Sequence, residues 1–151
     1  MNEQASQVVV EVAKTLIDAM RKIAPSWTRV FMRLDASDQN IGAKGSYVTD
    51  NGVSLLGTLD HEQLFGAMLS LGSKLRQATS NNGKQFVVCL ILIDSNFDYE
   101  VKFEYDDPKR WEITKLDGAS GIPIGIANGA SPGVTPHEPA PRDRKPWYKL
   151  W

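Results

Sequence analysis

Apolar residues near the start of the chain recur at steps of three and four, and charged residues fill most of the positions between them. This pattern is typical of an amphipathic helix. We expect the helix to end before Pro25, because proline cannot continue the helical hydrogen bonding. The apolar face consists of Val9, Val12, Leu16, Ala19, Met20 and Ile23.

From Trp27 to Leu34 the apolar period changes to two, which predicts a first strand. The stretch 35–45 is rich in Asp, Asn, Ser and Gly and is interpreted as a turn. Residues 46–49 are then expected to form a partner strand before a second turn at Asp50-Asn51-Gly52. The region therefore predicts a hairpin.

A second helix is predicted to start at Asp60, which can serve as a cap, with Gln63 three residues later as in a capping box. It is expected to end near residues 81–83, where Asn-Asn-Gly is typical of a turn. Its apolar stripe consists of Leu64, Met68, Leu71 and Leu75.

The stretch Phe86–Ile93 is wholly apolar, which indicates a strand buried on both faces. Residues 97–105 alternate between apolar and mostly acidic residues, and the short loop 94–96 predicts that the two strands pair antiparallel. A further short edge strand is predicted at 111–116. Together the patterns predict an α+β fold, with two helices packed on a mainly antiparallel sheet of four or five strands.

The composition changes after Asp117, because the last 34 residues hold six of the eight prolines and five of the twelve glycines. We therefore expect a folded domain at 1–117 and an irregular, basic, aromatic tail at 118–151. The tail is expected to dock on the domain, because a free end would expose its aromatic rings. It also forms a second candidate partner-binding surface, consisting of Arg142, Arg144, Trp147, Tyr148 and Trp151.

The overall composition is that of an ordinary globular protein, with 151 residues, 42% hydrophobic residues and a formal net charge of -1. This charge removes the general basicity expected of a nucleic-acid binder. The longest apolar run has eight residues, far below the ~18 of a membrane span, and no basic leader precedes it. We expect a cytoplasmic protein that binds neither membrane nor nucleic acid directly.

No motif predicts catalysis, a cofactor or a metal. Gly83-Lys84 is followed by Gln85 and does not form a phosphate loop, and the glycines at 118–121 do not form a nucleophile elbow. The single cysteine, Cys89, falls in the apolar strand and is expected to be inert. With His61 and His137 it gives no zinc-finger spacing. We therefore expect a protein that is not an enzyme and has no small-molecule substrate.

The most distinctive chemistry is acidic: six carboxylates stand against Lys102 between residues 94 and 107. Three interpretations stay open: a solvated strand face, an acid and base pair of the glycosidase kind, or an acidic surface that docks a basic partner. Alternate strand residues lie about 6.6 Å apart, so Asp98 and Glu100 could share a ligand. The candidate partner-binding residues are Asp98, Glu100, Glu104, Asp106 and Asp107.

The order of these predicted elements resembles that of the YezG-like immunity proteins. The resemblance covers about residues 5–116 and depends most on 97–107 with Trp111, then on Trp27 and the helix at 64–75. It implies an immunity protein that binds and neutralises the C-terminal toxin domain, plausibly a nuclease, of a contact-dependent inhibition or other polymorphic toxin system. It transfers no toxin-contacting residues, and the tail departs from the short ending of the family. The alternatives are a chaperone or adaptor for a secreted effector and a small hydrolase that uses Asp98, Glu100 or His61.

Overall fold

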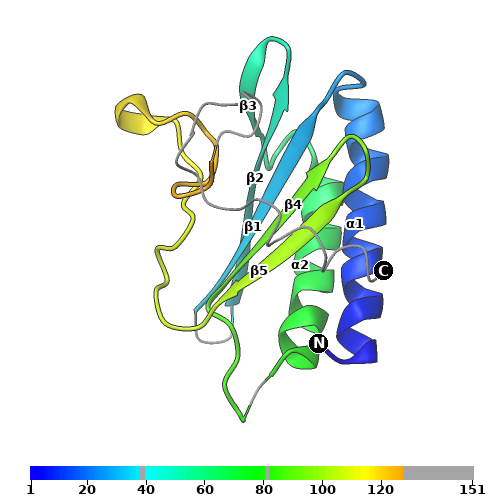
Figure 1. Cartoon of the computed structure of the whole chain (residues 1–151), viewed down its shortest axis with the longest axis vertical. Helices are drawn as coiled ribbons and strands as arrows, with labels where there is room; N and C mark the ends of the chain where they lie inside the picture. The colour runs from blue at the N-terminus through cyan, green and yellow to red at the C-terminus, as the bar shows by residue number, and fades with distance from the viewer. Residues whose placement is uncertain (38–39, 81, 128–151) are drawn as a thin grey trace.

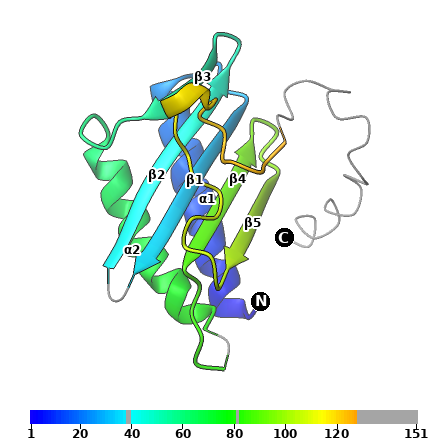
Figure 2. The ribbon, with the colours of Figure 1, turned by 90° about the vertical axis from the view of Figure 1, so that its left-hand side faces the viewer.

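The computed structural model describes residues 1–37, 40–80 and 82–127. Two helices cover one face of a five-stranded sheet, and every neighbouring pair of strands is antiparallel, which confirms the predicted α+β fold (Figure 1). The strand order is β3-β2-β1-β4-β5, as Figure 2 shows. The elements are α1 (Glu3–Ile23), β1 (Arg29–Ser37), β2 (Asn40–Thr49), β3 (Gly52–Leu56), α2 (Glu62–Ala78), β4 (Val88–Asp94), β5 (Tyr99–Glu104) and a 3-10 turn, η1 (Leu116–Gly118).

The amphipathic helix α1 lies where its apolar period predicts. The Asn2 side chain caps its start by accepting a hydrogen bond of 2.7 Å from the backbone of Ala5, and the helix ends at Ile23, before Pro25. Most of its apolar stripe is buried in the core on the helix face of the sheet, with Ala19 and Ile23 half-buried at its edge, and Trp27, just after the helix, is buried as well. Within the described residues no helix is long and apolar enough to cross a membrane.

The predicted turn at 35–45 is wrong. The β1–β2 hairpin extends much further: β1 continues to Ser37, β2 begins at Asn40, and these two residues face each other in the register. Glycine allows close packing here, since a Cβ atom on Gly45 would lie 2.8 Å from a methyl group of Leu56. Polar and small residues therefore form paired strand where the sequence resembles a loop.

The second helix keeps its predicted apolar stripe but not its predicted ends. Its N-cap is His61, which makes no side-chain cap bond, and the carboxylate of Asp60 lies beside Gly57 instead. The helix ends at Ala78, short of 81–83. Its stripe residues are buried, as predicted.

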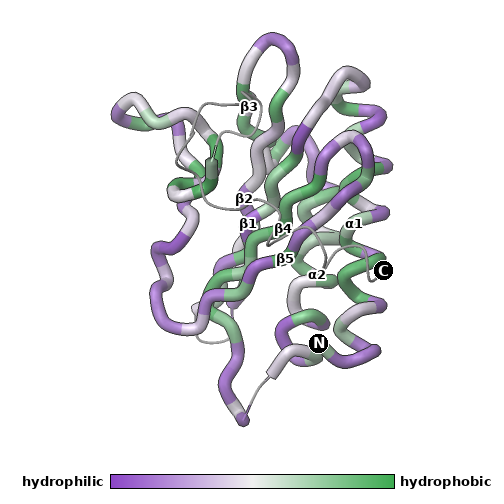
Figure 3. Tube along the Cα trace, in the orientation of Figure 1, coloured by the Kyte–Doolittle hydropathy of each residue, from purple (hydrophilic) through white to green (hydrophobic). Residues whose placement is uncertain are grey.

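A buried core lies on each face of the sheet. The helices cover one face, and on the other, which we call the outer face, an irregular segment at 106–127 packs on residues of β1, β2 and β4. Figure 3 shows this segment on the side of the sheet away from the helices. The predicted edge strand at 111–116 is wrong, because Trp111 has a φ of 59° and the segment runs as turns and coil. Ile122 is buried, and the Ser46 hydroxyl donates to the Gly121 carbonyl at 2.6 Å, so residues that the sequence places in the tail pack on the sheet.

Candidate partner-binding surface

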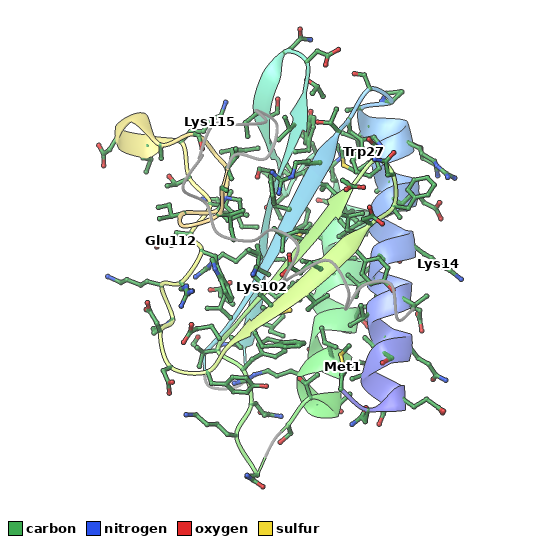
Figure 4. The ribbon with its side chains drawn as sticks, viewed as in Figure 1. Met1, Lys14, Trp27, Lys102, Glu112 and Lys115 are labelled. Atoms are coloured by element: carbon green, nitrogen blue, oxygen red, sulfur yellow. The ribbon has the colours of Figure 1, made fainter. Side chains whose placement is uncertain are left out.

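The alternation along β5 divides the strand as predicted. Its acidic side lies on the outer face, because each of these residues is paired with a β4 residue of the outer core. Its apolar side packs against the core on the helix face. The outer residues are Glu100, Lys102 and Glu104, and the inner ones are Tyr99, Val101 and Phe103. Figure 4 labels Lys102 on this strand, and Glu112 and Lys115 on the irregular segment.

Glu104 holds the chain that follows β5. Its carboxylate accepts hydrogen bonds of 3.1 Å from the backbone N–H groups of Asp106 and Asp107, and it pairs with Arg110 at 3.0 Å. These backbone donors, above all that of Asp107, and then the Arg110 charge hold the pKa of Glu104 below its ordinary value. Glu104 therefore stabilises the turn that follows β5.

Arg33 fixes the same segment from inside the sheet. This buried side chain of β1 donates to the carbonyls of Pro108 and Arg110, both at 2.8 Å. The sequence reasoning missed this role. A signal is present in the sequence, because Arg33 is the one charged residue in the apolar stretch 30–34, where a buried charged side chain needs a partner.

The other predicted carboxylates, apart from Asp98, bind partners within the protein. Glu100 pairs with Lys102 at 3.1 Å, and Asp106 pairs with Lys84 at 2.8 Å. Asp107 accepts from the backbone of Lys109 at 2.9 Å. Because the Glu100 and Glu104 side chains are only 17% and 14% exposed, the expectation of an open, solvated strand face is wrong.

Asp98 is the exception among the five. It is exposed, and its carboxylate takes part in no ion pair or side-chain hydrogen bond within the part of the chain that the structure describes. It lies in the turn between β4 and β5, six residues before Glu104 in the sequence, and this turn lies beside the C-terminal part of α1 (Figure 1). The five predicted carboxylates therefore do not form one continuous site.

The β4–β5 turn is firmly held. The Asp94 carboxylate accepts from the backbone N–H groups of Asn96 at 2.8 Å and Asp98 at 3.2 Å. Ser95 donates from its backbone to the Thr28 carbonyl at 2.9 Å, which ties the turn to the start of β1. We call Asp94–Asp98 the hairpin tip.

Two hollows border the hairpin tip. One of about 650 Å³ separates the tip from the β2–β3 turn and is lined by Asp50, Asp94 and Arg29 among others. Arg29 lies over the Phe31 ring at 4.9 Å and donates to the Ala127 carbonyl at 3.4 Å. The other hollow, of about 120 Å³, brings Asp98 and Glu100 to one site, but it is smaller than the 300 Å³ or more of a typical ligand pocket.

His61 does not line the hollow that holds Asp98 and Glu100. It lines a cleft of about 580 Å³ between α1 and α2, on the helix side of the sheet, whereas Glu100 lies on the outer face. Cys89 is buried in β4, and burial raises the pKa of its thiol well above its ordinary value. Across residues 1–127 with their two gaps, no three His, Cys, Asp or Glu side chains converge as metal ligands.

No protein-family model matches the chain, and no curated protein matches it. The residues of the second candidate surface, Arg142, Arg144, Trp147, Tyr148 and Trp151, lie outside the described residues, as does His137.

Proposed function

We propose that this protein is an immunity protein of the YezG-like kind, which binds a cognate toxin domain in the cytoplasm and neutralises it by stoichiometric contact. The order of elements that carries the resemblance is also the order of the fold, from α1 through the buried strand β4 to the acidic strand β5. A binding inhibitor needs a stable surface with complementary shape and charge, and it needs no catalytic group of its own.

One observation carries the proposal: three carboxylates that form no ion pair within the described residues gather at one end of the sheet. Asp50 on the β2–β3 turn and Asp94 on the hairpin tip line the same hollow, and Asp98 follows on that tip. A nuclease toxin presents Lys and Arg that hold phosphates, so an acidic end of this kind fits such a toxin.

The experiment co-expresses this protein with the C-terminal domain encoded by the gene immediately upstream. We expect protection of the cells from that domain and a stable complex with it after purification. Failure to protect, with no complex, would contradict the proposal. A complex without protection would favour a chaperone or adaptor, and substrate turnover that disappears in Glu100→Gln would favour a hydrolase.

A charge-reversal variant tests the surface. Asp50→Lys combined with Asp98→Lys should slow association with the toxin domain about tenfold or more at low salt and flatten its dependence on ionic strength, because both charges steer a basic partner. The matched control is Glu3→Lys with Glu11→Lys, two exposed positions on α1 that change the net charge equally. Equal slowing in both double variants would show that overall charge, and not this surface, governs association.

A further inference from the structure

Phe97 has a backbone conformation that its residue type disfavours. It occupies the last position of the three-residue loop 95–97, closed by a hydrogen bond of 3.0 Å from the Asp94 N–H to the Asp98 carbonyl. Its φ is 69°. In three-residue hairpin loops this left-handed position is usually glycine, because a side chain there crowds the backbone. The prediction that Phe97 begins the strand is wrong for this reason, and β5 begins at Tyr99.

Burial of the Phe97 ring contributes little to the stability of the fold. The residue is 48% exposed, and its ring lies under the Arg21 guanidinium of α1 at 5.4 Å, a contact that leaves much of the ring in solvent. A strained non-glycine conformation persists only where something compensates for it, and such residues concentrate at functional sites. Burial does not supply that compensation for Phe97.

The loop presents this ring in a fixed place. The Asp94 carboxylate and the Ser95 backbone tie the hairpin tip to itself and to β1. Phe97 itself donates from its backbone to the Asp94 carbonyl at 2.9 Å. A partner therefore loses little conformational entropy when it binds the ring, which favours affinity.

We propose that Phe97 is the aromatic anchor of the toxin-binding surface, inserted into an apolar pocket whose rim carries Lys or Arg to pair with Asp98. This inference rests on the proposed function and specifies the surface and the chemistry of the partner. Aromatic residues, Phe among them, are enriched at protein interfaces, where a few central residues carry most of the binding energy, and the exposed Asp98 carboxylate beside Phe97 can add charge complementarity.

The test measures the affinity of the toxin domain for four forms of the full chain: wild type, Phe97→Gly, Phe97→Tyr and Leu59→Ala. Leu59 is the matched control, because it is an exposed apolar residue, 84% accessible, on the loop before α2. Phe97→Gly should bind at least about 30-fold more weakly, and Leu59→Ala should stay close to wild type. Phe97→Tyr keeps the ring but brings a hydroxyl into the apolar pocket, so its loss of affinity should be smaller than that of Phe97→Gly.

Thermal melting accompanies each affinity measurement. The melting temperature of Phe97→Gly should stay within about 4 °C of wild type, since glycine is suited to this backbone position. Wild-type affinity in Phe97→Gly would overturn this inference and leave the proposed function standing. Absence of binding by the wild type would instead contradict the proposed function.

Discussion

Two aromatic residues, Phe97 before β5 and Trp111 after it, adopt left-handed backbone conformations with φ values of 69° and 59°. The other two non-glycine residues with positive φ in the described chain are Asn82 and Asp117, types that tolerate it. Trp111 is buried in the outer core, and Arg110 lies 4.9 Å from its ring centre. Phe97 is half exposed. Burial of its ring compensates for the strain at Trp111. At Phe97 the hydrogen bonds of the hairpin tip hold the backbone, but the ring itself is left half exposed, which is why only Phe97 indicates a binding role.

The largest expected effect is at Trp111. Changing Trp111→Gly relieves the backbone but removes a buried ring from between the outer segment and β4, so the free energy of unfolding should fall by about 3 kcal/mol or more. Urea unfolding measures this. If Trp111→Gly unfolds like the wild type, the ring does not hold the segment and the contrast with Phe97 fails.

Arg33→Met should have the next largest effect. Methionine keeps an apolar side chain of similar length at this position but cannot donate to the carbonyls of Pro108 and Arg110. We therefore expect the free energy of unfolding to fall by about 2–3 kcal/mol. Hydrogen exchange should also quicken in the 106–113 segment. Unchanged exchange there would show that the segment is held without Arg33.

Glu104→Gln should destabilise the protein by less, and the loss should depend on pH. The folded pKa of Glu104 lies below its ordinary value of 4.5, so its charge stabilises the fold above about pH 4.5 and this contribution is lost as the pH falls through the folded pKa. The difference in melting temperature between wild type and Glu104→Gln should therefore be present at pH 7 and shrink at pH 3. A difference of the same size at both pH values would contradict the role of the charge, and Glu11→Gln is the exposed control.

The hydrophobic period along a strand can be read from the sequence, whereas the backbone hydrogen bonds between strands cannot. The apolar run in β4 and the alternation in β5 predict both strands and their antiparallel pairing, because the two faces of each strand have different surroundings, but they do not predict where the turn between them begins and ends. The stretch 35–45 does not predict its strands, since β2 is stabilised there by backbone pairing with β1, which any small polar residue can make. The packing of the outer segment on the sheet cannot be predicted for a related reason. Hydrogen bonds from Arg33 and Ser46, which are distant in the sequence, hold the segment, and such contacts leave no periodic pattern in it.

The candidate site was predictable in its acidic character but not in its geometry. Residue types placed Asp98, Glu100 and Glu104 on one strand, but the partners of Glu100 and Glu104 depend on rotamers and on the path of the chain after β5. Phe97 fits the alternation, which predicts a strand residue, but the three-residue loop 95–97 places it in the turn.

The most direct test of the central claim is the free energy of unfolding of Phe97→Gly, measured in urea beside the wild type. Relief of the left-handed strain, about 1–2 kcal/mol, should offset the greater freedom of glycine in the unfolded chain and the loss of the Arg21 contact. We expect the two proteins to agree within about 1 kcal/mol. A loss as large as that of Trp111→Gly would contradict the account, because Phe97 would then serve the fold and not a partner.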